Sequence, residues 1–290
     1  MKDYMNPSGK NPFLFIRGRW ILPVFFFVPS FIAIFIYMLW PAGSSADLWP
    51  EIISSILGYC LTAYFINWIA ERAELDKWLV VGRMPGKEEI LGYLLLVIPM
   101  FLLSFGCLFL FYLPLSYLTP ALVNSLLIED PVILIWSKGP FLVLANLMNF
   151  LLIVAIAPII EEIVFRGLLI SRWSVKWGTP RAILFSSIIF GIGHLDFIGG
   201  FFFGVVMAVL YIKSNSLIIP ILVHVANNFI FWIFALVETI FSKSTDEYSL
   251  ADFQSEWWMG ALGLIIGVPW VFRYMKSNWN ELYRHVPYFA

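Results

Sequence analysis

Two adjacent carboxylates and an arginine interrupt an otherwise apolar stretch of the chain. Glu161, Glu162 and Arg166 lie among isoleucine, valine and phenylalanine residues. An ionisable side chain inside a membrane is costly unless it is paired or hydrated, so such groups usually mark a functional site or a path for protons or ions. This stretch is therefore the leading candidate for chemistry.

The spacing of these three residues predicts different tasks for the two glutamates. Residues four apart share one face of a helix, so Glu162 and Arg166 are expected to form an internal ion pair. Glu161 is rotated by about 100° from Glu162 and has no partner nearby in the sequence. We expect Glu161 to be available for chemistry and the other two residues to support it.

Two further pairs have the same helical spacing. Phe190 precedes His194 by four residues, and His224 precedes Asn228 by four. A carboxylate beside an imidazole can deprotonate a water molecule near neutral pH. A second histidine and an asparagine amide can donate hydrogen bonds to the oxyanion that then develops. These residue types predict a hydrolase.

The composition indicates how such residues are positioned. Hydrophobic residues make up 61% of the chain and charged residues only 13%, against about 25% charged in soluble proteins. Apolar runs of roughly 20 residues must be helices in a bilayer. The sequence therefore predicts an all-α, polytopic membrane bundle of about eight transmembrane helices. The expected spans are Trp20–Trp40, Pro50–Ala70, Ile90–Leu118, Phe141–Arg172, Arg181–Phe197, Gly200–Lys213, Leu217–Phe241 and Met259–Met275.

The basic residues predict the orientation of these spans. With the N-terminus in the cytoplasm, every lysine and arginine except Lys138 and Lys243 falls on the cytoplasmic side, as the positive-inside rule requires. We therefore expect a multi-pass protein of the cell membrane with both termini in the cytoplasm. No long linker divides the chain, so residues 1–290 are expected to form a single membrane domain, in which residues 141–241 carry the three motifs as a catalytic core.

Helix geometry predicts that the motifs lie at similar depths. Glu161 is ~16 Å from Arg172 along a helix, and His194 is ~20 Å from Arg181. His224 and Asn228 are ~10 and ~16 Å from Leu217, where their span begins. Pro158, one turn before Glu161, is expected to kink its helix.

The ordered set of motifs resembles a known family. Glu161-Glu162-x-x-x-Arg166-Gly167, Phe190-x-x-x-His194, Gly200-x-x-x-Gly204 and His224-x-x-x-Asn228 occur within about 70 residues. This order is similar to that of the CAAX protease and bacteriocin-processing (CPBP) family of intramembrane proteases. The resemblance implies hydrolysis of a peptide bond near the cytoplasmic side. It also implies that Glu161 and His194 activate water, that His224 and Asn228 stabilise the oxyanion, and that Glu162, Arg166 and Phe190 support the site.

Two alternatives to this water-activating protease remain open. Glu161, His194 and His224 could bind zinc as two histidines and one carboxylate, although no cofactor is otherwise expected. The same groups could instead relay protons or bind a partner in a non-enzymatic transport or immunity scaffold. The expected partners are the lipid bilayer and a membrane-associated, possibly prenylated, protein or peptide substrate, and not nucleic acid.

Overall fold

The described part of the chain is built of helices. The computed structural model describes residues 11–40, 49–128, 140–241 and 248–290, and within them the only β-type pairing is an isolated bridge between Gly82 and Ser216. Lys138 and Lys243 lie outside the described residues. The long helices are α1 (Gly18–Leu39), α2 (Trp49–Arg72), α5 (Val97–Leu118), α7 (Pro140–Leu151), α10 (Thr179–Ile192), α11 (Phe197–Ser214), α12 (Ile218–Phe241) and α14 (Trp257–Ser277).

Shorter helices extend or connect the long ones. Helix α4 (Lys87–Leu94) leads into α5, and α7 continues through α8 (Ala157–Glu162) into α9 (Ser171–Trp177). Seven helical segments of the described residues are long and apolar enough to cross a membrane. The prediction of an all-α, multi-pass membrane bundle is thus confirmed.

One expected span was wrong in length. The run Arg181–Phe197 contains only α10, whose 14 residues reach about 21 Å, short of a hydrocarbon core of about 30 Å. Gly193 ends α10, and Asp196 begins α11 as its N-cap. Gly193, His194 and Asp196 interrupt the apolar run at this turn, but the prediction placed all three inside a single span.

Helices α10 and α11 pack closely beneath the turn that joins them. A Cβ atom added to Gly204 would lie 2.9 Å from the Cβ atom of Ser187, and one added to Gly191 would lie 2.6 Å from the carbonyl oxygen of Phe197. Small residues allow such an approach between membrane helices. The glycines therefore place α11 directly against the helix that precedes His194.

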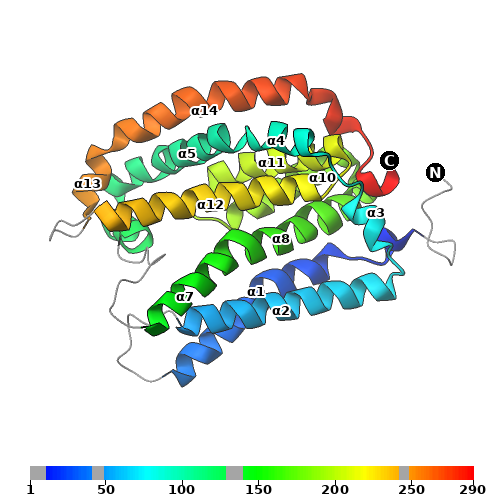
Figure 1. The fold of residues 1–290 in the computed structure, drawn as a ribbon, viewed down its shortest axis with the longest axis horizontal. Coiled ribbons are helices and arrows are strands. Elements are labelled where there is room, and N and C mark those ends of the chain that lie inside the picture. The colour runs from blue at the N-terminus through cyan, green and yellow to red at the C-terminus, as the bar shows by residue number, and fades with distance from the viewer. Residues whose placement is uncertain (1–10, 41–48, 129–139, 242–247) are drawn as a thin grey trace.

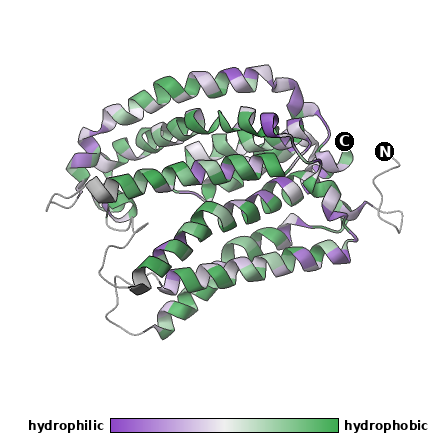
Figure 2. Cartoon of the chain, viewed as in Figure 1, coloured by the Kyte–Doolittle hydropathy of each residue, from purple (hydrophilic) through white to green (hydrophobic). Residues whose placement is uncertain are grey.

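The beginning and the end of the described chain meet at one end of the bundle. The ring of Phe13 lies 4.8 Å from that of Tyr288 and 5.7 Å from that of Phe289. At the same end, on the right in Figure 1, lie α3 (Lys77–Val81) and the start of α10. Hydrophobic residues dominate the lengths of the helices, whereas hydrophilic residues are frequent at this end (Figure 2).

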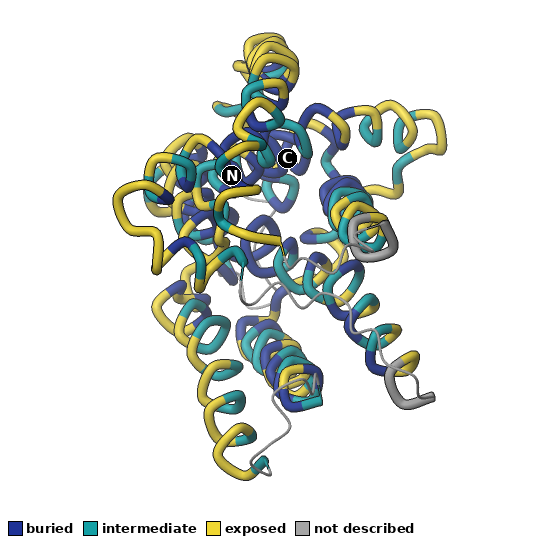
Figure 3. Tube along the Cα trace, turned by 90° about the vertical axis from the view of Figure 1, so that its left-hand side faces the viewer, coloured by how far each residue is buried: buried dark blue, intermediate teal, exposed yellow. Residues whose placement is uncertain are grey.

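The core lies where the helices face one another. Buried residues occupy the inner sides of the helices and exposed residues the outer sides (Figure 3). Helix α11 is the most enclosed of the long helices, with a run from Val206 to Ile212 entirely buried. Tyr211 in this run donates a hydrogen bond to the carbonyl of Val80, 3.0 Å away, which ties α3 to the core.

Candidate active site

The helix that carries the glutamates changes its hydrogen-bond register before it reaches them. In the π-helical turn η3 (Leu152–Ile156), Ala157 donates its N–H to Leu152, five residues back. Pro158 follows and has no N–H, so it cannot donate to Ile153. The side-chain amide nitrogen of Asn228 donates to this carbonyl instead, at 2.9 Å. The carbonyl of Ile153, which lacks a backbone donor, thus accepts its hydrogen bond from a side chain of α12.

A second π-helical segment follows the glutamates directly. It is η4 (Ile163–Ile170), which contains Arg166. π-Helical turns inside α-helices are rare and occur frequently at functional sites. Each one rotates the residues that follow it relative to an uninterrupted α-helix. The sequence predicted a kink at Pro158 but contained no sign of this second change.

The expected ion pair between Glu162 and Arg166 is present. An oxygen of Glu162 lies 3.0 Å from a terminal nitrogen of Arg166, and both side chains are at most 1% exposed. Arg166 also donates to the carbonyl of Gly204 at 3.3 Å. Its guanidinium carbon lies 4.4 Å from the centre of the Phe190 ring. Arg166 therefore connects three helical segments of the site.

His224 contacts both glutamates. Its Nδ1 lies 2.8 Å from the Glu162 oxygen that Arg166 also contacts, and its Nε2 lies 3.8 Å from Oε2 of Glu161. An ionised carboxylate only accepts hydrogen bonds, so the proton belongs on Nδ1 of His224. From the sequence, Glu162 was expected to pair with Arg166 alone, and this second partner, 62 residues away, was not predicted.

His194 approaches Glu161 from the other side. Its Nδ1 lies 2.7 Å from the carbonyl of Phe190, one turn earlier. Because a carbonyl accepts, Nδ1 donates, and the neutral ring presents the lone pair of Nε2. This Nε2 lies 3.9 Å from Oε2 of Glu161. The ring centres of His194 and Phe190 are 4.4 Å apart, so the phenylalanine also supports the imidazole.

The turn that carries His194 is held by residues outside the motifs. The hydroxyl of Tyr112 on α5 donates to the carbonyl of Leu195 at 3.1 Å. Asp196 accepts from the N–H of Gly199 at 2.9 Å and caps α11. Tyr112 was missed because nothing in its neighbourhood in the sequence distinguishes it.

The exposure of these side chains falls from one side of the cluster to the other. The side chain of His194 is 39% exposed and that of Glu161 is 15% exposed. Those of His224 and Glu162 are 4% and 0% exposed. A molecule entering the cluster would thus meet His194 and Glu161 first, while Glu162 remains enclosed behind them.

The arrangement leaves three atoms around one point. They are Oε2 of Glu161 and the Nε2 atoms of His194 and His224, and both of their separations from Glu161 exceed a direct hydrogen bond. Polar atoms separated by more than about 3.5 Å are often bridged by water. Asn228 lies one turn beyond His224, and its hydrogen bond joins it to Ile153 and not to this cluster. Within the described ranges, no set of three or more histidine, cysteine, aspartate or glutamate side chains is arranged to hold a metal ion.

The segment that carries the motifs matches one protein-family model. Residues 143–230 match the family described as type II CAAX prenyl endopeptidase Rce1-like. This segment contains all three motifs, and the match confirms the resemblance seen in the sequence. No curated protein and no solved structure gives a significant match to the chain.

Proposed function

We propose that this chain is an intramembrane endopeptidase, from the premise that residues 143–230 match the family of type II CAAX prenyl endopeptidases described as Rce1-like. In this proposal an activated water molecule hydrolyses the peptide bond of the substrate. The observation that carries the proposal is the convergence of Glu161, His194 and His224 on one point. Two imidazole nitrogens within 3.9 Å of a single carboxylate oxygen are what general-base hydrolysis requires.

In this mechanism Glu161 and His194 prepare the water. The water donates one hydrogen to Oε2 of Glu161 and the other to the Nε2 lone pair of His194. Glu161 takes its proton as the water oxygen attacks the carbonyl carbon of the scissile peptide bond. When the tetrahedral intermediate collapses, Glu161 returns this proton to the leaving amine. The hydrogen bond from His194 to the carbonyl of Phe190 keeps Nε2 directed at the water.

His224 is proposed to stabilise the oxyanion as a cation. Its Nδ1 proton is engaged by Glu162, so Nε2 can donate only when the ring is protonated. The two carboxylates, Glu161 and Glu162, together balance this imidazolium and Arg166 in the buried site. We assign the second oxyanion contact to Asn228, whose amide has one N–H bonded to Ile153 and a second one to offer.

Replacing His224 distinguishes the water-activating mechanism from the zinc-dependent alternative, because His224 has a different role in each. If His224 donates a hydrogen bond, His224→Ala is expected to lower kcat by about 10²–10³-fold and to leave residual activity that chelators do not affect. A zinc ligand would behave differently, because its loss releases the metal and abolishes activity. His285→Ala, in the exposed C-terminal segment, is the matched control. Stoichiometric zinc in the active protein that is lost with His224→Ala would contradict the proposal.

The substrate is proposed to be a membrane-associated protein or peptide, with a prenylated C-terminus as the leading candidate. The family description supports this class. We expect proteomics of membrane fractions to reveal peptides that shorten in cells with the wild-type chain and remain uncut in cells with Glu161→Gln. Identical peptide profiles in the two cell types would exclude proteolysis as the function.

We further propose that both termini face the cytoplasm and that the protein resides in the cell membrane. The contacts of Phe13 with Tyr288 and Phe289 place the beginning and end of the described chain at one end of the bundle. Basic residues such as Arg17, Arg72 and Arg284 lie in segments at that end, which the positive-inside rule assigns to the cytoplasm.

A further inference from the structure

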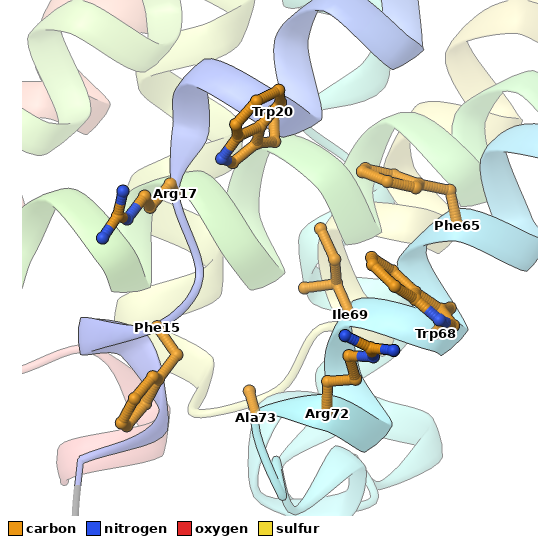
Figure 4. A pocket seen from close by; sticks show the side chains of 8 residues that line it. All are labelled: Phe15, Arg17, Trp20, Phe65, Trp68, Ile69, Arg72 and Ala73. Carbon is orange, nitrogen blue, oxygen red and sulfur yellow. The ribbon is translucent and has the colours of Figure 1, made fainter.

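A cavity lies between the start of α1 and the end of α2, away from the three motifs. The two helices approach closely further along, where a Cβ atom on Gly58 would lie 2.8 Å from Pro29. Towards the basic end of the bundle they leave a cavity of about 470 Å³. This volume is within the usual range for ligand sites. The lining residues, shown in Figure 4, are Phe15, Arg17, Trp20, Phe65, Trp68, Ile69, Arg72 and Ala73.

The walls of the cavity are mainly aromatic. Trp20 on α1 stands opposite Phe65 and Trp68 on α2, whose rings stack with centres 5.8 Å apart (Figure 4). Trp20 is 58% exposed, and Phe15 is 55% exposed. Tryptophan is enriched at the level of lipid head groups because its ring is apolar and its N–H is polar. The cavity thus has walls suited to the boundary between acyl chains and head groups.

The charged side chains that line the cavity are both arginines, and neither is paired with a carboxylate in the described part of the chain. Arg17 and Arg72 stand on opposite sides of the opening (Figure 4), and no acidic side chain lines it. Among the described residues neither arginine forms an ion pair. The guanidinium carbon of Arg72 lies 4.5 Å from the Trp68 ring, a cation–π contact that leaves its N–H groups available. Arg172 on α9 adds a third positive charge near Arg17.

Two nearby carboxylates have partners other than the arginines of the cavity. Glu71, the neighbour of Arg72, accepts from Asn67 at 2.8 Å and lies 3.9 Å from Lys77. Asp76 accepts the backbone N–H groups of Trp78 and Leu79 as the N-cap of α3. Neither carboxylate forms an ion pair with Arg17 or Arg72 among the described residues.

We propose that this cavity binds the head group of an anionic phospholipid. The arginines attract the phosphate, and the aromatic walls contact the glycerol and the first methylene groups. The acyl chains extend along the outer face of α1, where large apolar side chains such as Phe27, Phe31 and Phe35 are exposed. A soluble anion would use the arginines but not these walls, whereas a zwitterionic lipid would gain little from the net positive charge. The proposal does not depend on the proposed protease activity.

Native mass spectrometry of the full-length protein in a non-ionic detergent tests this site. Phosphatidylglycerol is expected to bind at least about tenfold more tightly than phosphatidylcholine with the same acyl chains. The double variant Arg17→Gln/Arg72→Gln should weaken phosphatidylglycerol binding by about 30-fold, since each basic residue contributes about fivefold. It should leave phosphatidylcholine binding unchanged. Arg17→Lys/Arg72→Lys, which preserves the charge, should retain most of the preference.

The matched control is Lys87→Gln/Lys276→Gln, which removes the same charge from other helices at the same end of the bundle. It should change phosphatidylglycerol binding less than twofold. Thermal unfolding in the same detergent identifies any variant that does not fold. If a variant does not fold, the preference of the wild type for phosphatidylglycerol over phosphatidylcholine tests the proposal by itself. The proposal would be overturned if the wild type bound the two lipids equally well, or if the control variant lost as much phosphatidylglycerol binding as the arginine variant. It would also be overturned if inorganic phosphate or a farnesylated peptide competed as effectively as phosphatidylglycerol.

Discussion

Glu161→Gln is expected to lower kcat by about 10²–10⁴-fold, the usual contribution of a general base. Glutamine has the shape of glutamate but cannot take a proton from water. Folding should be preserved, because the Glu161 side chain is 15% exposed and the ion pair of Glu162 with Arg166 does not include it. The measurement is the cleavage rate of a substrate peptide by protein in detergent or nanodiscs, together with the unfolding temperature.

Glu88→Gln is the matched control for this variant. Glu88 is exposed in the first turn of α4, so the same chemical change there should leave the cleavage rate unaltered. A Glu161→Gln protein that folds and cleaves at the wild-type rate would show that Glu161 is not the base. Loss of the fold in that variant would instead contradict the separate tasks assigned to the two glutamates.

The second large effect is expected on stability. Arg166→Ala leaves Glu162, which is 0% exposed, with a buried negative charge and only His224 beside it. Breaking a buried ion pair in this way should lower the free energy of unfolding by about 3–5 kcal/mol. Glu162→Gln should have a similar effect, because it leaves the arginine unpaired. The double variant Glu162→Gln/Arg166→Met removes both charges and should lose less than the sum of the two single variants.

An exposed ion pair on the same protein is the control for this comparison. Glu71 and Lys77 lie 3.9 Å apart, with side chains 65% and 52% exposed, and Glu71→Gln should lower the free energy of unfolding by no more than about 1 kcal/mol. Denaturant titration of all variants in one detergent provides the measurement. Equal unfolding temperatures for Glu161→Gln, Glu162→Gln and Arg166→Ala would refute the assignment of Glu162 and Arg166 to the support of the site.

The fold class and the local part of the site were predictable from the sequence. Apolar runs in a bilayer have to be helices, since no water is present to satisfy the backbone, and seven such helices are found within the described residues. The pair of Glu162 with Arg166 was predictable because residues four apart on a helix are neighbours whatever the rest of the chain does.

The contacts that complete the site depend on how the helices pack. The spacing of the motifs could not reveal that Nδ1 of His224 contacts Glu162 and that its Nε2 faces Glu161, because residues 62 positions apart meet only through the packing of α12 against α8. The same holds for Tyr112 on α5, which holds the turn beside His194.

The backbone around the motifs was also decided by tertiary contacts. The sequence indicates that Pro158 lacks an N–H, but only the position of α12 supplies Asn228 as the donor to Ile153. Likewise, α10 ends after 14 residues and α11 begins at Phe197 in close contact with it, so a turn interrupts the expected span Arg181–Phe197. Local spacing thus determined which residues could react. The packing of distant helices determined their orientation, since burial and hydrogen bonds between helices have no fixed sequence separation.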